Sequence, residues 1–180
     1  KILTSQAYYI LGENSHPEDV DKNSFSEHVQ MFREKLKESV KLRLRSDVPV
    51  GCYLSGGIDS SVTSLLAKEI NKQSFKSFSV TFSDPGLDES HYQKLMVDSL
   101  NSEHHSVNIN GNDIEENFFN VAKHFERPVF RTAPTPLFLL SKKVREENVK
   151  VVLTGEAADE ILFGYDTNRE LLLLKKWKKG

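Results

Sequence analysis

Apolar and polar residues follow two different periods along the chain, and these periods predict alternating helices and strands. Apolar positions recur every three or four residues over five segments, which predicts amphipathic helices at residues 25–45, 60–70, 88–100, 113–125 and from Thr135 onward. Short apolar or alternating segments between them predict strands at residues 50–54, 75–82, 104–109 and 149–153. This order favours an α/β fold in which a mostly parallel sheet carries helices on both faces.

The composition is that of one soluble globular domain over residues 1–180. The chain has 180 residues, of which 38% are hydrophobic and 28% charged, and its formal net charge is −2. Such a charge gives no reason to expect nucleic acid or an anionic membrane as the partner, so a small molecule is expected. No apolar stretch reaches the ~18 to 20 residues that span a bilayer, and the first residues lack the layout of a signal peptide. The expected location is therefore cytoplasmic.

The cysteine and the paired histidines are interpreted as structural residues. Cys52 is the only cysteine, which excludes an internal disulfide, and it lies in an apolar strand pattern. His104 and His105 are neighbours in a predicted strand, where adjacent side chains point to opposite faces of the sheet. We therefore do not expect these histidines to bind one metal ion together.

The most informative segment is Leu-Ser-Gly-Gly-Ile-Asp-Ser-Ser at residues 54–61, between a predicted strand and a predicted helix. Two adjacent glycines let the backbone approach a ligand closely, and the helix start directs free N–H groups at the same place, which favours phosphate binding. The spacing differs from a Walker loop and from a dinucleotide fingerprint. Asp59 would repel a phosphate unless a magnesium ion bridges the two, so the segment also predicts a divalent cation. The alternative is an ordinary Gly-Gly turn followed by a serine-capped helix.

A second motif, Thr-Gly-Glu-Ala-Ala-Asp-Glu at residues 154–160, directly follows the last predicted strand. The carboxyl ends of parallel strands meet at one edge of a sheet, so both motifs are expected to face one crevice. Acidic residues also stabilise the first turn of any helix, which is the alternative role for Glu156, Asp159 and Glu160. Beside a phosphate loop, we interpret them instead as groups that hold magnesium or orient a nucleophile.

These segments resemble a known family. Residues 55–61, Ser-Gly-Gly-Ile-Asp-Ser-Ser, are similar to the pyrophosphate loop of the N-type ATP pyrophosphatases, the PP-loop superfamily. Together with Ser-Asp-Val-Pro-Val-Gly at residues 46–51 and the motif at residues 154–160, they resemble the C-terminal synthetase domain of glutamine-dependent asparagine synthetases. The likeness covers roughly residues 25–177. It implies an adenine nucleotide alpha hydrolase-like fold of the Rossmann-like kind.

The resemblance implies an ATP-dependent carbon–nitrogen ligase. ATP would adenylate the side-chain carboxylate of aspartate to β-aspartyl-AMP with release of pyrophosphate, and ammonia would then displace AMP to give asparagine. By match of motif, the residues that would bind ATP and pyrophosphate are Leu54, Ser55, Gly56, Gly57, Asp59, Ser60, Ser61, Val80, Thr154 and Gly155. Asp59 and Asp159 would hold Mg²⁺. The catalytic residues would be Asp59 and Glu156, with Glu156 forming or using the adenylate and accepting a proton from ammonia.

The sequence departs from the family pattern at four points. The family's glycine after the glutamate is Ala157 here, and its glycine before Gly164 is Phe163. Because an alanine ordinarily takes a negative φ, we expect a regular helix entry at Ala157. Residue 1 is lysine, so the family's N-terminal glutaminase domain, with its amino-terminal cysteine, is expected to be absent and a glutaminase domain or subunit becomes a candidate partner. The family's catalytic lysine is not assigned to any lysine of the tail at residues 175–179.

The acceptor substrate is less well defined by the sequence. Arg131 and Thr132 lie in a proline-punctuated loop, and we interpret them as candidates for gripping a carboxylate substrate; the alternative is an ordinary exposed loop. Two other interpretations of the chain stay open. One is a related amidotransferase that acts on another carboxylate, and the other is a non-catalytic ATP-binding or subunit-contact module.

Overall fold

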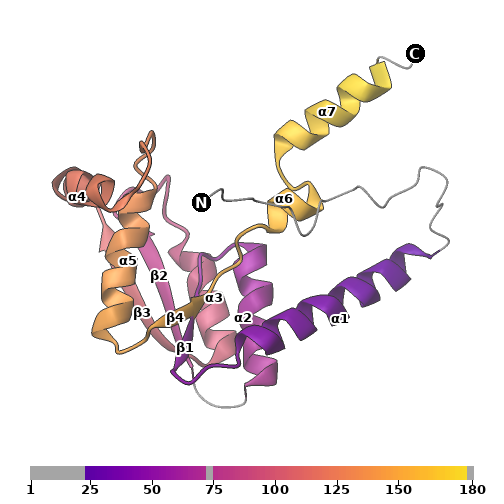
Figure 1. The fold of residues 1–180 in the computed structure, drawn as a ribbon, viewed down its shortest axis with the longest axis horizontal. Coiled ribbons are helices and arrows are strands. Elements are labelled where there is room, and N and C mark those ends of the chain that lie inside the picture. Colours follow the sequence, from indigo (N-terminus) through magenta and orange to yellow (C-terminus); the bar gives the residue numbers. More distant parts are fainter. Residues whose placement is uncertain (1–22, 72–74, 178–180) are drawn as a thin grey trace, which may run out of the picture. The chain divides into compact units, whose positions relative to one another are not determined.

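The computed structural model describes residues 23–71 and 75–177, and a four-stranded parallel sheet forms the centre of its larger unit (Figure 1). The chain divides into two compact units, residues 1–36 and 37–180, and the sheet belongs to the second. The strands are β1 (Val50–Tyr53), β2 (Lys76–Phe82), β3 (Glu103–Ile109) and β4 (Val151–Leu153). The expectation of a single domain over residues 1–180 stays a prediction.

The order of the strands creates a crevice at one point of the sheet. The order is β3-β2-β1-β4, and every neighbouring pair is parallel. The chain therefore proceeds outward from β1 to β3 and then returns to place β4 on the other side of β1. In open parallel sheets, ligands bind beyond the carboxyl ends of the strands where the order reverses. Here that point lies between β1 and β4.

Helices cover both faces of the sheet, which confirms the predicted fold class (Figure 1). On one face, α2 (Ile58–Ile70) and α3 (Ser90–Leu100) contact β1, β2 and each other. On the other face, α5 (Pro134–Glu146) contacts β2 and β3, and α4 (Gly111–His124) packs against α5. The remaining helices are α1 (Phe25–Arg43), α6 (Ala158–Leu162) and α7 (Asp166–Trp177). No helix of the described residues is long and apolar enough to cross a bilayer.

The predicted elements are present with small differences at their ends. The helix α2 begins at Ile58 rather than at residue 60, so Asp59 belongs to its first turn. The strand β4 begins at Val151 rather than at residue 149. Val149 is nevertheless buried, because it packs with Phe78, Leu140 and Val144. Its N–H donates to the carbonyl of Val144 near the end of α5. The apolar stripe predicted for α1 is buried only at Val40, while Phe25 is 85% exposed.

The two faces of the sheet bury different residues. Toward α5, Phe78 packs with Leu140, Val144 and Val149. Alternate residues point to the other face, where Cys52 and several serines are buried beneath α2 and α3. Burial raises the pKa of the Cys52 thiol to about 11, which suits a core residue and not a nucleophile.

The two histidines point to opposite faces, as predicted from their adjacency. His105 stacks on Phe78, with 5.5 Å between the ring centroids. His104 lies on the other face between two buried hydroxyls: its Nδ1 is 2.9 Å from Ser77 Oγ, and its Nε2 is 2.9 Å from Ser79 Oγ. Burial, and secondly the charge of His105, lower the pKa of His104 below its ordinary value of 6.5.

An ion-pair network lies at the amino ends of β2 and β3, away from the crevice. Glu147 Oε1 is 2.7 Å from Lys143 Nζ, and Glu147 Oε2 is 3.0 Å from Lys76 Nζ. These lysines lower the pKa of Glu147 to about 2. The ligand atoms of Glu103, His105 and Glu147 lie within 4.8 Å of one another, a spacing that a metal ion could use. Because two ammonium groups already neutralise the carboxylates, we interpret the cluster as a structural ion-pair network.

The lowered pKa of His104 predicts that the fold is less stable in mild acid. Between its pKa in the fold and 6.5, the unfolded chain binds the proton more readily, so the free energy of unfolding should fall as pH decreases below about 6.5. Chemical denaturation between pH 7.5 and 5 should show this slope, and His104→Gln should reduce it. The exposed His91 provides the matched control, His91→Gln. An unchanged slope in His104→Gln would contradict the assignment.

The buried hydroxyl of Thr135 predicts a stabilising substitution. Thr135 is fully buried at the start of α5, and among the described residues its Oγ1 has no hydrogen-bond partner. Thr135→Val keeps the shape and removes the unpaired group, so the free energy of unfolding should rise by about 1–2 kcal/mol. Thr132→Val, at an exposed position, should change it by less than about 0.5 kcal/mol. Destabilisation by Thr135→Val in urea denaturation would show that the hydroxyl is satisfied.

Candidate active site

A cavity of about 450 Å³ lies beyond the carboxyl ends of β1, β2 and β4, where the strand order reverses. Its wall combines residues of both predicted motifs with apolar residues from the start of α5. The predicted site residues that line it are Leu54, Ser55, Gly57, Asp59, Ser60, Val80, Thr154, Gly155, Glu156 and Asp159. Thus the expectation that the two motifs face one crevice agrees with the structure, while the roles of these residues stay predictions.

The glycine turn after β1 is shaped by its contact with α3. Gly56 has a φ of +93°, and a Cβ on it would lie 3.0 Å from the Cβ of Tyr92 and 3.3 Å from the N of Gln93. Only glycine fits both this conformation and this close approach. Gly56 does not line the cavity, because it packs against α3 on the other side of the turn. Its role is therefore to shape the loop.

The start of α2 presents unpaired backbone donors at the cavity. In the part of the chain that the structure describes, the N–H groups of Ile58, Asp59 and Ser60 have no carbonyl acceptor, as is usual in a first helical turn. Of these residues, Asp59 and Ser60 line the cavity and Ile58 does not. Hydroxyls fix the loop in front of them: Ser60 Oγ lies 2.9 Å from Ser55 Oγ and donates to the carbonyl of Gly57 at 3.1 Å. Free N–H groups with the positive end of the helix dipole form a site suited to phosphate.

Ser61 lies just outside this arrangement. Its hydroxyl donates to the carbonyl of Gly57 at 2.7 Å, and Ser61 is not among the residues that line the cavity. The hydroxyl thus contacts the helix backbone in this structure.

The end of β4 touches the start of α2. A Cβ on Gly155 would lie 2.5 Å from the N of Ser60 and 2.7 Å from the C of Asp59, so no other residue fits at position 155 without a shift of the backbone. This contact brings the second motif against the first.

The second motif bends in a way that the sequence did not predict. Ala157 has a φ of +74° and Phe163 a φ of +59°, so both ends of α6 are left-handed. The expectation of a regular helix entry at Ala157 is wrong. The turn from β4 into α6 requires the left-handed conformation that the family's glycine would take without strain, and alanine takes it here at an energetic cost.

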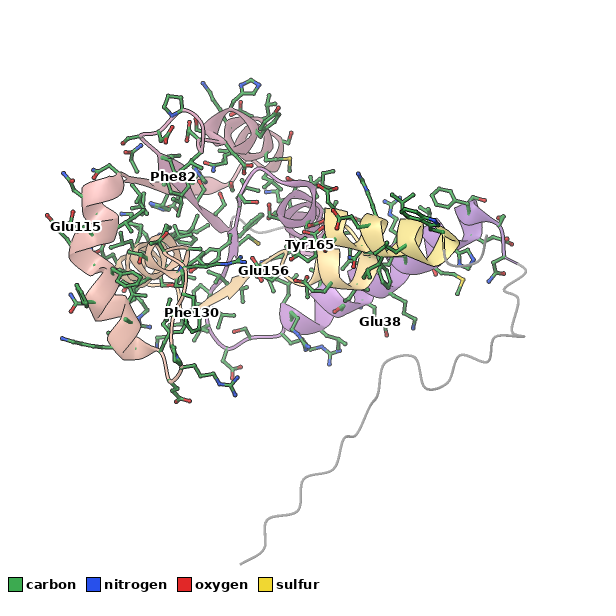
Figure 2. The ribbon with its side chains drawn as sticks, turned by 90° about the horizontal axis from the view of Figure 1, so that it is seen from above. Glu38, Phe82, Glu115, Phe130, Glu156 and Tyr165 are labelled. Carbon is green, nitrogen blue, oxygen red and sulfur yellow. The ribbon has the colours of Figure 1, made fainter. Side chains whose placement is uncertain are left out.

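Gly164 and Tyr165 hold the acidic residues of α6 in place. A Cβ on Gly164 would overlap Asp159 Oδ1, and the N–H of Gly164 donates to the carbonyl of Asp159 at 3.0 Å. The hydroxyl of Tyr165 donates to Glu160 Oε1 at 2.7 Å, which lowers the pKa of Glu160 and raises that of Tyr165. Glu156 and Tyr165 lie before and after α6 and are labelled in Figure 2.

The charge of the cavity wall is strongly one-sided. Five carboxylates line it, and no lysine, arginine or histidine of the described residues does. The five are Asp59, Glu89, Glu156, Asp159 and Glu160. Such a wall would repel a polyphosphate unless a cation accompanied it, and carboxylate oxygens from two motifs are the ligands that Mg²⁺ prefers. The donor chemistry of the wall therefore suits a magnesium ion, and the assignment of Asp59 and Asp159 as its ligands stays a prediction.

The structure does not bring Arg131 and Thr132 into the cavity wall. Both are exposed in the segment before α5, and the wall on this side consists of Ala133, Pro136 and Leu137.

Sequence reasoning missed other wall residues, among them Gln93, which is only 4% exposed. Its position in an amphipathic helix gives no signal that could have singled it out.

The sequence of the chain matches the family described as "Asparagine synthase" over residues 31–179. The chain belongs to the asparagine synthase family. Asparagine synthetase [glutamine-hydrolyzing] 1 of Bacillus subtilis is 38% identical over 151 residues, which cover 84% of the chain and 24% of that relative. Putative asparagine synthetase [glutamine-hydrolyzing] 2 of Methanocaldococcus jannaschii is 35% identical over 141 residues, 78% of the chain and 27% of that relative.

The chain is also similar to a relative that is not named as an asparagine synthetase. Amidase chyE of Penicillium rubens is 35% identical over 167 residues, 85% of the chain and 25% of that relative. The chain thus spans about a quarter of the length of the curated relatives it matches. The solved structure of the NH3-dependent NAD synthetase from Campylobacter jejuni superposes with a TM-score of 0.51 at 21% identity, over 76% of this chain and 60% of that one. This likeness concerns the fold alone.

The left-handed conformation of Ala157 predicts that glycine at this position is stabilising. Ala157→Gly should raise the free energy of unfolding by about 1 kcal/mol, since a left-handed L-residue costs roughly 1–2 kcal/mol. The next residue gives the matched control, because Ala158→Gly lies in α6 and should lower the free energy of unfolding by about 0.5–1 kcal/mol. Urea denaturation of both variants measures the difference. A loss of stability in both would contradict the strain at Ala157.

Proposed function

We propose that the chain is the ATP-binding core of an amide-forming ligase of asparagine synthetase type. The observation that carries the proposal is the juxtaposition of unpaired helix-start amides and carboxylates from two motifs in one cavity. Membership of the asparagine synthase family supports it. In this proposal, ATP adenylates the side-chain carboxylate of aspartate to β-aspartyl-AMP, pyrophosphate leaves, and ammonia displaces AMP to give asparagine.

The loop and the start of α2 would bind the leaving pyrophosphate. Among the described residues, the N–H groups of Asp59 and Ser60 at the cavity wall have no backbone acceptor, so they would donate to phosphate oxygens. The serine hydroxyls around Gly57 keep the loop in this shape. Magnesium bound by Asp59 and Asp159 would neutralise charge on the phosphates. Phosphoryl transfer of this kind depends mainly on positioning and charge neutralisation, which this wall is suited to supply.

The apolar part of the wall is suited to the nucleoside. Leu54 is 1% exposed beside the loop, and Val80 lies across the end of β1. These residues and Gly155 would contact adenosine, with Thr154 at the end of β4 beside them. The base would thus lie toward β2 while the phosphates extend toward α2.

Glu156 is the candidate for the proton transfer of the second step. Ammonia that attacks the adenylate carries a surplus proton when AMP leaves, and a carboxylate at the cavity wall can accept it. Glu156 is exposed, lines the cavity and follows β4 directly. Ammonia could come from a glutaminase domain or subunit, as the names of the glutamine-hydrolysing relatives suggest.

The acceptor carboxylate could also differ from aspartate. Amidase chyE covers the chain as fully as the asparagine synthetases do, which favours a related amidotransferase as the second candidate. The wall beside α5 is apolar, so recognition of aspartate would need residues from outside the wall, such as Arg131 and Thr132, which precede the wall residue Ala133 in the chain. Arg131→Ala should then raise the KM for aspartate while the affinity for ATP is unchanged.

Release of AMP and pyrophosphate tests the proposal. With ATP, Mg²⁺, aspartate and ammonia, the chain should release both products, and Asp59→Asn should reduce the rate by about 10²-fold or more because the metal loses a ligand. Asp98→Asn, at an exposed position of α3, is the matched control and should leave the rate unchanged.

The outcomes separate the candidate functions. Release that requires a carboxylate other than aspartate would replace the asparagine synthetase assignment by the related amidotransferase. Magnesium-dependent ATP binding without AMP release under any of these conditions would favour the non-catalytic ATP-binding module. Absence of ATP binding would overturn the proposal altogether.

A further inference from the structure

The edge of β2 beside the cavity lacks a strand partner beyond β1. The N–H of Leu54 still donates to the carbonyl of Phe78 at 2.8 Å, but β1 ends at Tyr53 while β2 continues to Phe82. Residues two apart in a strand present their backbone groups to the same side. The backbone groups of Val80 and Phe82 therefore face the space that β1 has left.

Side chains of α3 and of the residues just before it take the place of the missing strand. Gln93 Nε2 donates to the carbonyl of Val80 at 2.8 Å, and the N–H of Phe82 donates to Asp88 Oδ1 at 3.1 Å. One short segment thus pairs two backbone groups of β2, the carbonyl of Val80 and the N–H of Phe82, which face the space left by β1. This segment is the same one against which Gly56 packs.

Gln93 makes a second contact that links β2 to the glycine turn. Its Nε2 also lies 3.3 Å from the carbonyl of Ser55, so one amide group bridges the ends of β1 and β2. Gln93 is 4% exposed and lines the cavity. Only the NH₂ end of the amide can face two carbonyl oxygens, because the other end would place three oxygens together. The contacts therefore fix the orientation of the side chain.

We propose that Gln93 is a positioning residue that sets the spacing between the phosphate loop and the nucleoside side of the cavity. Its uncharged amide group donates to the carbonyl of Ser55 on one side and to the carbonyl of Val80 on the other. The inference deepens the proposed function, since it rests on ATP as the ligand. Glutamine is suited to the role because it offers two N–H donors from one atom and carries no charge that would repel phosphate.

Two substitutions at Gln93 separate this role from simple packing. Gln93→Met keeps the length of the side chain and removes both donors. Gln93→Glu keeps the shape and, when ionised, opposes both carbonyls with a negative charge, yet it regains one donor when it is protonated. Both should weaken the binding of ATP and Mg²⁺ by about 10-fold or more at pH 7.5, since the carbonyls of Ser55 and Val80 lose the donor that fixes their spacing.

The deciding readout is rescue by acid. Relative to the wild type at the same pH, Gln93→Glu should regain affinity for ATP between pH 7.5 and 5.5, while Gln93→Met should not. Gln30, which is exposed in α1, gives the control pair Gln30→Met and Gln30→Glu, and both should bind ATP as the wild type does. Unchanged affinity in a folded Gln93→Met variant, or equal pH dependence of the two Gln93 variants, would overturn the proposal.

Hydrogen exchange without nucleotide tests Gln93 independently of the proposed function. In Gln93→Met, the amides of residues 54–61 should exchange faster than in the wild type, while those of α5 should be unchanged. If the wild type bound no ATP, the proposed function would fail, and this comparison would still decide the role of Gln93. Equal exchange of residues 54–61 in both proteins would refute it.

Discussion

The site depends on the absence of a side chain at Gly155. Because β4 pairs directly with β1, the segment after β4 must pass over the first turn of α2, where a Cβ would lie 2.5 Å from the amide of Ser60. The contact places the acidic motif against the first turn of α2, so residues of both motifs line one cavity.

The electrostatics of the cavity follow from this geometry. Unpaired N–H groups attract phosphate, whereas five carboxylates around them repel it. In the proposed function, a magnesium ion would offset this repulsion, because carboxylates of the wall would hold the ion beside the phosphates. The ion-pair network around Glu147 has the opposite character, because its carboxylates are already neutralised by Lys76 and Lys143. The same residue type thus has different roles at the two ends of the sheet.

Sequence alone was sufficient for the parts of the structure that periodicity and local motifs determine. The sequence could place the glycine turn and the acidic motif together, because each follows a strand and the carboxyl ends of parallel strands lie at one edge of the sheet. The bend at Ala157 could not be predicted, since tertiary contacts of β4 and α6 override the usual preference of alanine for a negative φ. The role of Gln93 could not be predicted either. Its two acceptors, in Ser55 and Val80, are distant in sequence. Both are backbone carbonyls, which every residue type has, so the sequence does not reveal them.

The left-handed residues at the two ends of α6 affect which substitutions this region tolerates. Gly155 before α6 and Gly164 after it leave no room for a Cβ, so close contacts hold the backbone on either side of the two left-handed residues. We therefore expect substitution at positions 157 and 163 to change the cost of folding more than the path of the backbone. Phe163 is 68% exposed, so its side chain is free to vary in chemistry. The left-handed conformation at positions 157 and 163 thus follows from the surrounding fold, and more than one residue type can occupy these positions.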